Sequence, residues 1–217
     1  MRKKIIIMTM AFMSLVSFSK AENVVIEDFT ITCGESMTVT LNLSNSRKTL
    51  TAFELTLTLP EGLTLDVENT HLTGRYPGRL VVGTPEENVY KLCGIDTGLG
   101  VITGTSGALI ELTFTASERF RGGVATLTEG YFVTTDRQKI SVTDSDINVG
   151  YELKPGTLLG DVNNDGTVNV TDVMLTVNYV IGKDPANFIL ENADLNFDST
   201  ITITDVMMIV NIIISGS

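Results

Sequence analysis

The chain has 217 residues, of which 26 are acidic and 15 basic, and its formal net charge is −11. This length suggests one large domain or two smaller ones. So acidic a balance disfavours nucleic acids and anionic membrane surfaces as partners, and it suits cation binding. We therefore expect no nucleic-acid partner.

The first 21 residues have the pattern of a secretory signal peptide. Three basic residues at positions 2–4 precede an apolar stretch, 5–18, and residues 19–21 place small side chains at the cleavage positions. Cleavage after Ala21 removes four basic residues and no acidic one, so the acidic excess rises from 11 to 15. The apolar stretch is too short to span a bilayer comfortably, and no other segment is long and apolar enough to do so. We expect an exported protein that is secreted, attached to the cell surface, or periplasmic.

Residues 22–152 are predicted to form an all-β domain. Apolar and polar residues alternate at 37–43, 53–59 and 110–115, a period of two that puts one face of a strand in a core. Weaker strand candidates, bounded by Gly- and Pro-rich turns, are 24–31, 79–82, 89–92, 124–127 and 140–149. Eight or nine short strands without a helical period predict an antiparallel β-sandwich of jelly-roll type.

Two cysteines, Cys33 and Cys93, lie in this predicted domain. In an exported protein such a pair can form a disulfide, but the sequence does not show whether the two Cα atoms come within bridging distance. A disulfide and two free thiols are both open at this stage.

After residue 152 the pattern changes from strands to a repeated loop and helix. Residues 153–158, with Pro155 and Gly156, are expected to be a linker. Beyond them, residues 161–182 align with 194–215 at an offset of 33, and 11 of the 22 paired positions are identical. An internal duplication of this kind indicates a structural repeat.

Each copy begins with a twelve-residue loop rich in oxygen side chains. Calcium loops take side-chain oxygens from positions 1, 3 and 5, a carbonyl from 7, a water through 9, and a carboxylate from 12. The residues at these six positions are Asp161, Asn163, Asp165, Thr167, Asn169 and Asp172 in the first copy, and Asp194, Asn196, Asp198, Thr200, Thr202 and Asp205 in the second. The spacing predicts two calcium ions, and it predicts that calcium binding drives folding of this region, because three carboxylates per loop repel one another without a cation.

The second loop departs from the calcium pattern at position 6. There Ser199 stands where the first loop has Gly166. A sharp turn at this position requires a positive φ, which is unfavourable for a residue other than glycine by about 1 kcal/mol. We expect the second site to bind calcium more weakly than the first.

The duplicated region resembles the type I dockerins of bacteria. The resemblance covers residues 159–214 and rests on the Gly-Asp-Val-Asn-Asn-Asp-Gly of 160–166 and on the Thr-Asp-Val-Met that follows each loop. It also rests on Asp at position 12 and on the missing entering helix, which Pro155 and Gly156 do not allow.

The resemblance implies a dockerin at residues 159–217 that binds calcium and docks onto a cohesin domain of another protein. In that family the two loop–helix units pack antiparallel, and their near-symmetry allows two binding orientations. Recognition in the family involves loop positions 10 and 11, which here are Val170, Thr171, Ile203 and Thr204, and the helix that follows each loop.

The segment 22–152 is similar to the cohesin-like and carbohydrate-binding-like sandwiches that precede dockerins in gut bacteria. The residues that carry this similarity are 29–35 and 51–62. It implies a protein-binding or sugar-binding scaffold, in an assembly on a cell surface or one that degrades polysaccharides.

Three functions compete for the whole chain. A non-enzymatic adaptor is the preferred one, and a carbohydrate-binding module tethered by its dockerin is the alternative. The chain has no Trp, and the aromatic candidates for sugar binding are Tyr76, Tyr90, Tyr131 and Phe132.

A glycoside hydrolase, the third function, needs two positioned carboxylates in a cleft, and the candidates Glu54, Asp66, Glu68 and Glu111 are explained as solvated strand or loop residues. The single histidine, His71, has no nucleophile nearby in the sequence, and we expect no enzyme.

Overall fold

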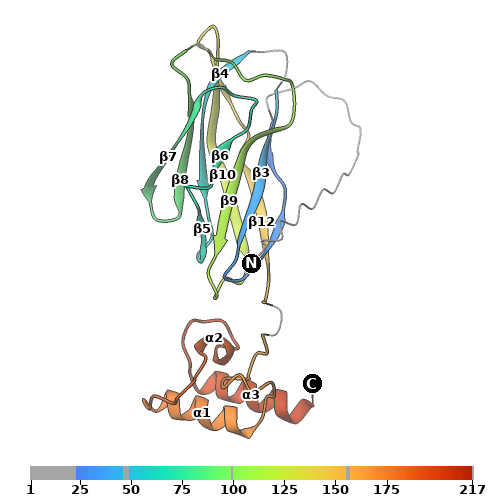
Figure 1. Cartoon of the computed structure of the whole chain (residues 1–217), viewed down its shortest axis with the longest axis vertical. Helices are drawn as coiled ribbons and strands as arrows, with labels where there is room; N and C mark the ends of the chain where they lie inside the picture. Colours follow the sequence, from blue (N-terminus) through green and yellow to red (C-terminus); the bar gives the residue numbers. More distant parts are fainter. Residues whose placement is uncertain (1–22, 46–48, 99, 155–156, 217) are drawn as a thin grey trace, which may run out of the picture.

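The computed structural model describes residues 23–45, 49–98, 100–154 and 157–216. These residues form a β-sandwich, here called the sandwich (23–152), and a helical C-terminal module (157–216) (Figure 1). The predicted signal peptide, 1–21, lies outside the described residues, as do residues 155 and 156 of the predicted linker.

Two sheets make up the sandwich. The first has the order β1–β3–β9–β5, with β6 also paired to β9, and its strands are β1 (Asn23–Ile26), β3 (Ser36–Ser44), β9 (Ala108–Ala116), β5 (Leu63–Leu65) and β6 (His71–Leu72). The second has the order β2–β12–β10–β4–β8–β7, with β11 also paired to β10. Its strands are β2 (Phe29–Thr32), β12 (Ser145–Glu152), β10 (Gly123–Thr134), β4 (Leu50–Thr58), β8 (Val89–Ile95), β7 (Arg79–Glu86) and β11 (Lys139–Ser141).

The mainly β class is confirmed, with differences in detail. The part of the chain that the structure describes has twelve strands rather than eight or nine. Two predicted segments, 24–31 and 140–149, each divide into two strands, and β5 and β6 are too short to show a period of two. The sandwich is antiparallel except at one place, where β2 runs parallel to β12.

The sandwich core lies between the two sheets and is built from the apolar face of each alternating strand. On β3 the inward residues Leu41 and Leu43 are fully buried, as is Phe132 on β10. Aromatic rings add tilted and stacked contacts, such as Phe53 with Phe132 at 5.7 Å between ring centroids. This core rigidly positions the turns at the ends of the sandwich.

Both cysteines are free thiols in the structure. The buried Cys33 Sγ donates a hydrogen bond to the carbonyl of Phe120 at 3.1 Å. Cys93 is half-buried on β8, and burial raises the pKa of its thiol, with a further contribution from the neighbouring Glu54 carboxylate. The disulfide alternative is therefore not realised here.

The C-terminal module consists of α1 (Val170–Val180), α2 (Leu190–Ala193) and α3 (Ile203–Ser215). Its small core is formed by Val162, Ala193, Leu195 and Ile209, against which the apolar faces of α1 and α3 pack. The sequence did not predict the short helix α2. This helix carries Asn192, whose side-chain amide donates to the carbonyl of Asp161 at 2.7 Å. The bond connects the start of the first loop to the segment before the second loop.

No helix among the described residues combines the length and the apolar character needed to cross a membrane.

Candidate functional site

The sequence fixes where the two long helices begin, because position 9 of each loop is an N-cap. The Asn169 side chain accepts from the Thr171 N–H at 2.7 Å, and Asp172 accepts in return from the Asn169 N–H at 2.9 Å. In the second copy Thr202 and Asp205 form the same capping box. This reciprocal arrangement satisfies orphan N–H groups at each helix start, so the loop residues also define α1 and α3.

Each loop folds around the carboxylate at its first position. The two oxygens of Asp161 accept from the N–H groups of Asp165 and Gly166, at 3.0 and 2.8 Å. In the second loop the two oxygens of Asp194 accept from the N–H groups of Asp198 and Ser199, at 3.2 and 2.9 Å. These two residues are the counterparts of Asp165 and Gly166 at the offset of 33. The duplication seen in the sequence is therefore repeated in the hydrogen bonds of the backbone.

The carboxylate at position 12 closes the loop. Asp172 Oδ1 accepts from the Val162 N–H at 2.9 Å, the residue beside Asp161. Asp205 Oδ1 accepts in the same way from the Leu195 N–H at 3.0 Å, beside Asp194. Positions 1 and 12 are thus brought to the same end of each loop.

Burial gives the strongest indication that a cation belongs here. Asp161, Asp172, Asp194 and Asp205 are 1%, 0%, 5% and 0% exposed, respectively. The ion pairs among the described residues involve the carboxylates of Glu54 and Glu118. None of the four buried aspartates has a basic partner in the part of the chain that the structure describes. A buried charge that is not paired is costly. The donor set, carboxylate and amide oxygens, is the one that Ca²⁺ prefers, so the residues fit this ion.

Positions 3, 5 and 7 lie at the exposed side of each loop. Asp165 accepts from the Thr167 hydroxyl and from the Asn163 amide, and these bonds, the first above all, lower the pKa of the Asp165 carboxyl. Asp198 is held likewise by Thr200 and then by the backbone and Asn196, and its pKa is also lowered. Both carboxyls therefore stay ionised at neutral pH, as a cation site requires.

The structure brings the predicted ligands into two compact loops but does not draw their carboxylates into one cluster. Over the described ranges, no three His, Cys, Asp or Glu side chains converge as the ligands of a metal ion would. The side chains at positions 1 and 12 are turned to backbone N–H groups, and those at position 9, Asn169 and Thr202, cap the helices.

The backbone at position 6 is left-handed in both loops, with φ of 89° at Gly166 and 66° at Ser199. We expect Ser199→Gly to tighten calcium binding at the second loop about fivefold, because it removes about 1 kcal/mol of backbone strain. The matched control is Gly166→Ser in the first loop, where an added Cβ meets no atom within 4 Å and the backbone alone is tested. Calorimetric titration should show the first change tightening one site and the second weakening the other. Equal calcium affinity of the second loop in the wild type and in Ser199→Gly contradicts the strain argument.

The four predicted partner-binding residues are all exposed. Val170 is 64% and Ile203 62% exposed, and Thr171 and Thr204 lie beside them. One helical turn further on, Met174 and Met207 are 61% and 54% exposed. The resemblance implies that the helix after each loop also takes part in recognition, and the spacing of four from Val170 and Ile203 puts the two methionines on the same helix faces. We call Val170, Met174, Ile203 and Met207 the docking residues.

Comparisons with known proteins agree with the two-part organisation. Residues 159–214 match the dockerin type I domain family, whereas no curated protein sequence matches the chain. One similar solved structure is the sixth cohesin of scaffoldin B from Acetivibrio cellulolyticus in complex with a mutant Cel5 dockerin. It is 15% identical, with a TM-score of 0.51, and the alignment covers 61% of this chain and 100% of the other.

A second similar structure is the cohesin module of a family 33 glycoside hydrolase from Clostridium perfringens. It is 12% identical, with a TM-score of 0.50, and the alignment covers 62% of this chain and 100% of that module. At such identity the likeness concerns the fold. The chain thus joins a β-sandwich with the cohesin-like fold to a C-terminal type I dockerin region.

Proposed function

We propose that the protein is an exported, non-catalytic adaptor that binds two calcium ions through its dockerin and docks onto a cohesin-type domain of another protein. The observation that carries the proposal is the pair of equivalent loops, each holding two buried carboxylates without a basic partner among the described residues. Two copies of one unusual arrangement are hard to explain as ordinary turns, because each buries charge at a cost that a cation offsets.

The proposed ligands are the twelve loop residues at positions 1, 3, 5, 7, 9 and 12. When bound, calcium neutralises the loop carboxylates and fixes the loop, and the loop in turn fixes the start of α1 and of α3 through the N-caps Asn169 and Thr202. The docking residues are then held on two adjacent helices that pack together.

The proposed domains follow from the sequence pattern and the fold: a signal peptide at 1–21, a cohesin-like sandwich at 22–152, a linker at 153–158 and a dockerin at 159–217. Export fits the positive and apolar N-terminal segment. An adaptor of this composition suits an assembly outside the cell or on its surface, including one that degrades polysaccharides.

The carbohydrate-binding alternative is disfavoured by where the aromatic candidates lie. Tyr76, Tyr90 and Phe132 are buried. The ring of Tyr131 is covered by Lys139, whose Nζ lies 3.8 Å from its centroid, and its hydroxyl donates to Glu54. A sugar-binding surface needs exposed planar rings, so the adaptor is the better explanation.

The experiment that tests the proposal is capture of the intact chain by isolated cohesin domains from the same organism, with calcium and with excess chelator. We expect at least one cohesin to bind in calcium and to release the chain when calcium is removed. Capture that is indifferent to chelator, or capture by none of the cohesins while a polysaccharide panel retains the chain, contradicts the adaptor.

A further inference from the structure

Within the described residues, the cationic side chain of Arg121 links the sandwich to the dockerin. Arg121 lies on the turn between β9 and β10, and its guanidinium Cζ is 4.2 Å from the centre of the Phe197 ring in the second calcium loop. The same group is 5.5 Å from the ring of Tyr151 at the end of β12. Both distances fall within the range of a cation–π contact.

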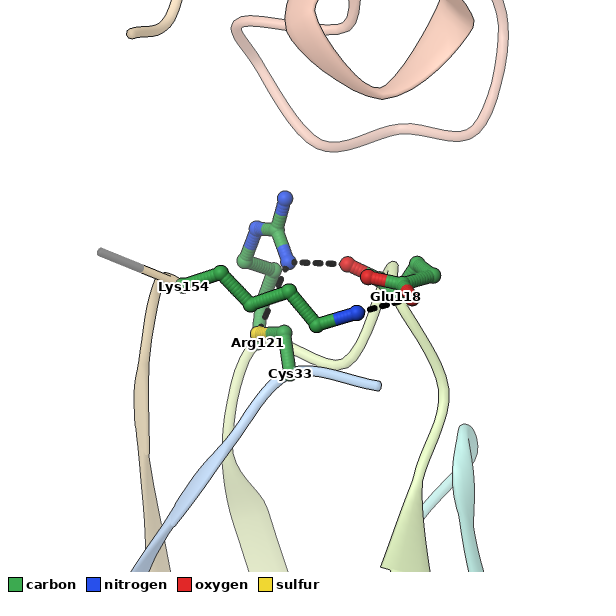
Figure 2. Close-up of polar contacts among 4 residues, drawn as sticks. All are labelled: Cys33, Glu118, Arg121 and Lys154. Carbon is green, nitrogen blue, oxygen red and sulfur yellow. Dashed lines mark hydrogen bonds and ion pairs between the residues drawn. The ribbon is translucent and has the colours of Figure 1, made fainter. Parts of the chain in front are cut away.

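The turn holds Arg121 in this direction. Its Nη1 donates to the carbonyls of Phe120 and Glu118, at 2.8 and 3.0 Å, and to Cys33 Sγ at 3.4 Å. Lys154, two residues beyond β12, bonds the Glu118 carboxylate at 2.5 Å. Figure 2 shows the Arg121 side chain extending from the turn toward the C-terminal module, with its guanidinium bonded to Glu118 and Cys33 and with Lys154 bonded to Glu118. These bonds therefore hold the guanidinium in the orientation that its contact with the Phe197 ring needs.

Phe197 occupies an unfavourable backbone position. It lies at position 4 of its loop with a φ of 61°, and its counterpart in the first loop, Asn164, has a φ of 58°. Asparagine tolerates this left-handed conformation, whereas a bulky aromatic residue does so rarely. Strain of this kind persists where the residue serves another purpose, and the contact with Arg121 provides one.

We propose that Arg121 and Phe197 form a latch that holds the second calcium loop against the sandwich and links calcium binding at that loop to the arrangement of the two domains. The inference rests on the proposed calcium sites. Because coupling is reciprocal, a contact that favours the closed loop strengthens calcium binding there, and calcium strengthens the contact. The docking residues remain more than half exposed with the latch formed, so the latch orients the dockerin without covering them.

A double-mutant cycle on the intact chain tests the latch: wild type, Arg121→Ala, Phe197→Asn and the double variant. Phe197→Asn installs the residue of the first loop and leaves the sandwich untouched. Backbone-amide NMR in calcium buffers follows Gly166 and Ser199, which report the two loops separately. We expect Arg121→Ala to weaken the second site about two- to fivefold, to spare the first, and to have no effect when Phe197 is already Asn.

Small-angle X-ray scattering supplies an independent readout. Arg121→Ala and Phe197→Asn should each increase the maximum dimension of the calcium-loaded chain, and Arg119→Ala, the removal of an exposed positive charge on the same turn, should not. An Arg121→Ala effect of equal size in both backgrounds, or dimensions unchanged in both single variants, overturns the latch. A chain that takes up no calcium refutes the proposed function instead, and the same scattering comparison on the calcium-free chain then still decides whether the contact exists.

Discussion

Asp172→Asn should abolish tight calcium binding at the first loop and destabilise the first turn of α1. The Asp172 carboxylate is fully buried and accepts from the N–H groups of Val162 and Asn169. An amide carries no charge, and its NH₂ would face one of these donors and leave that donor unpaired, which costs about 1–3 kcal/mol. Ligand charge sets calcium affinity over several orders of magnitude, so we expect a loss on the order of 100-fold.

Calorimetry on the intact chain measures this loss as a fall from two bound ions to one. Asp205→Asn is the matched change in the second loop and should remove the other ion. Asp184→Asn removes an exposed carboxylate of the same module outside the loops and should leave both sites intact. Two ions bound with unchanged affinity in the Asp172 variant would exclude the carboxylate at position 12 as a ligand.

Charging the docking residues should eliminate cohesin binding only when both helices are changed. Buried apolar anchors at an interface each contribute about 2 kcal/mol or more, and a carboxylate in their place is desolvated without a partner. If the two halves offer equivalent faces, Val170→Asp with Met174→Asp removes one of two binding orientations and weakens binding about twofold. Adding Ile203→Asp and Met207→Asp should weaken it by more than about 100-fold.

The measurement is the affinity of each variant, in calcium, for an immobilised cohesin that captures the wild-type chain. Calcium binding by both variants should be unchanged, because the four side chains are exposed and apolar and take no part in the loop hydrogen bonds. Undiminished binding by the fourfold variant would place recognition elsewhere. Complete loss in the α1 pair alone would show that one helix dominates and that the two orientations are not equivalent.

The sequence predicted the dockerin region well because its determinants are local. Position 9 caps the helix and position 12 returns a carboxylate to the same turn, so spacing alone places both residues. Likewise, Ser199 at position 6 adopts the positive φ that the spacing requires. Alternation of apolar residues was sufficient for the long strands β3, β4 and β9.

The parts that the sequence did not predict depend on contacts between distant segments. β5 and β6 are held by pairing to β9, and the parallel alignment of β2 with β12 joins residues about 120 positions apart. The contact of Arg121 with Phe197 links the sandwich to a calcium loop. No periodic pattern in the sequence predicts this contact. A phenylalanine at the fourth position of an Asp/Asn-rich loop was the one available signal.

Calcium titration of the chelator-stripped, intact chain decides whether the two loops bind calcium and whether binding orders the helices, with NMR following the amides of α1 and α3 at each step. We expect two ions to bind per chain and both helices to gain protection from hydrogen exchange as the ions bind. Helices equally protected in excess chelator, with no heat of calcium binding, would contradict this expectation.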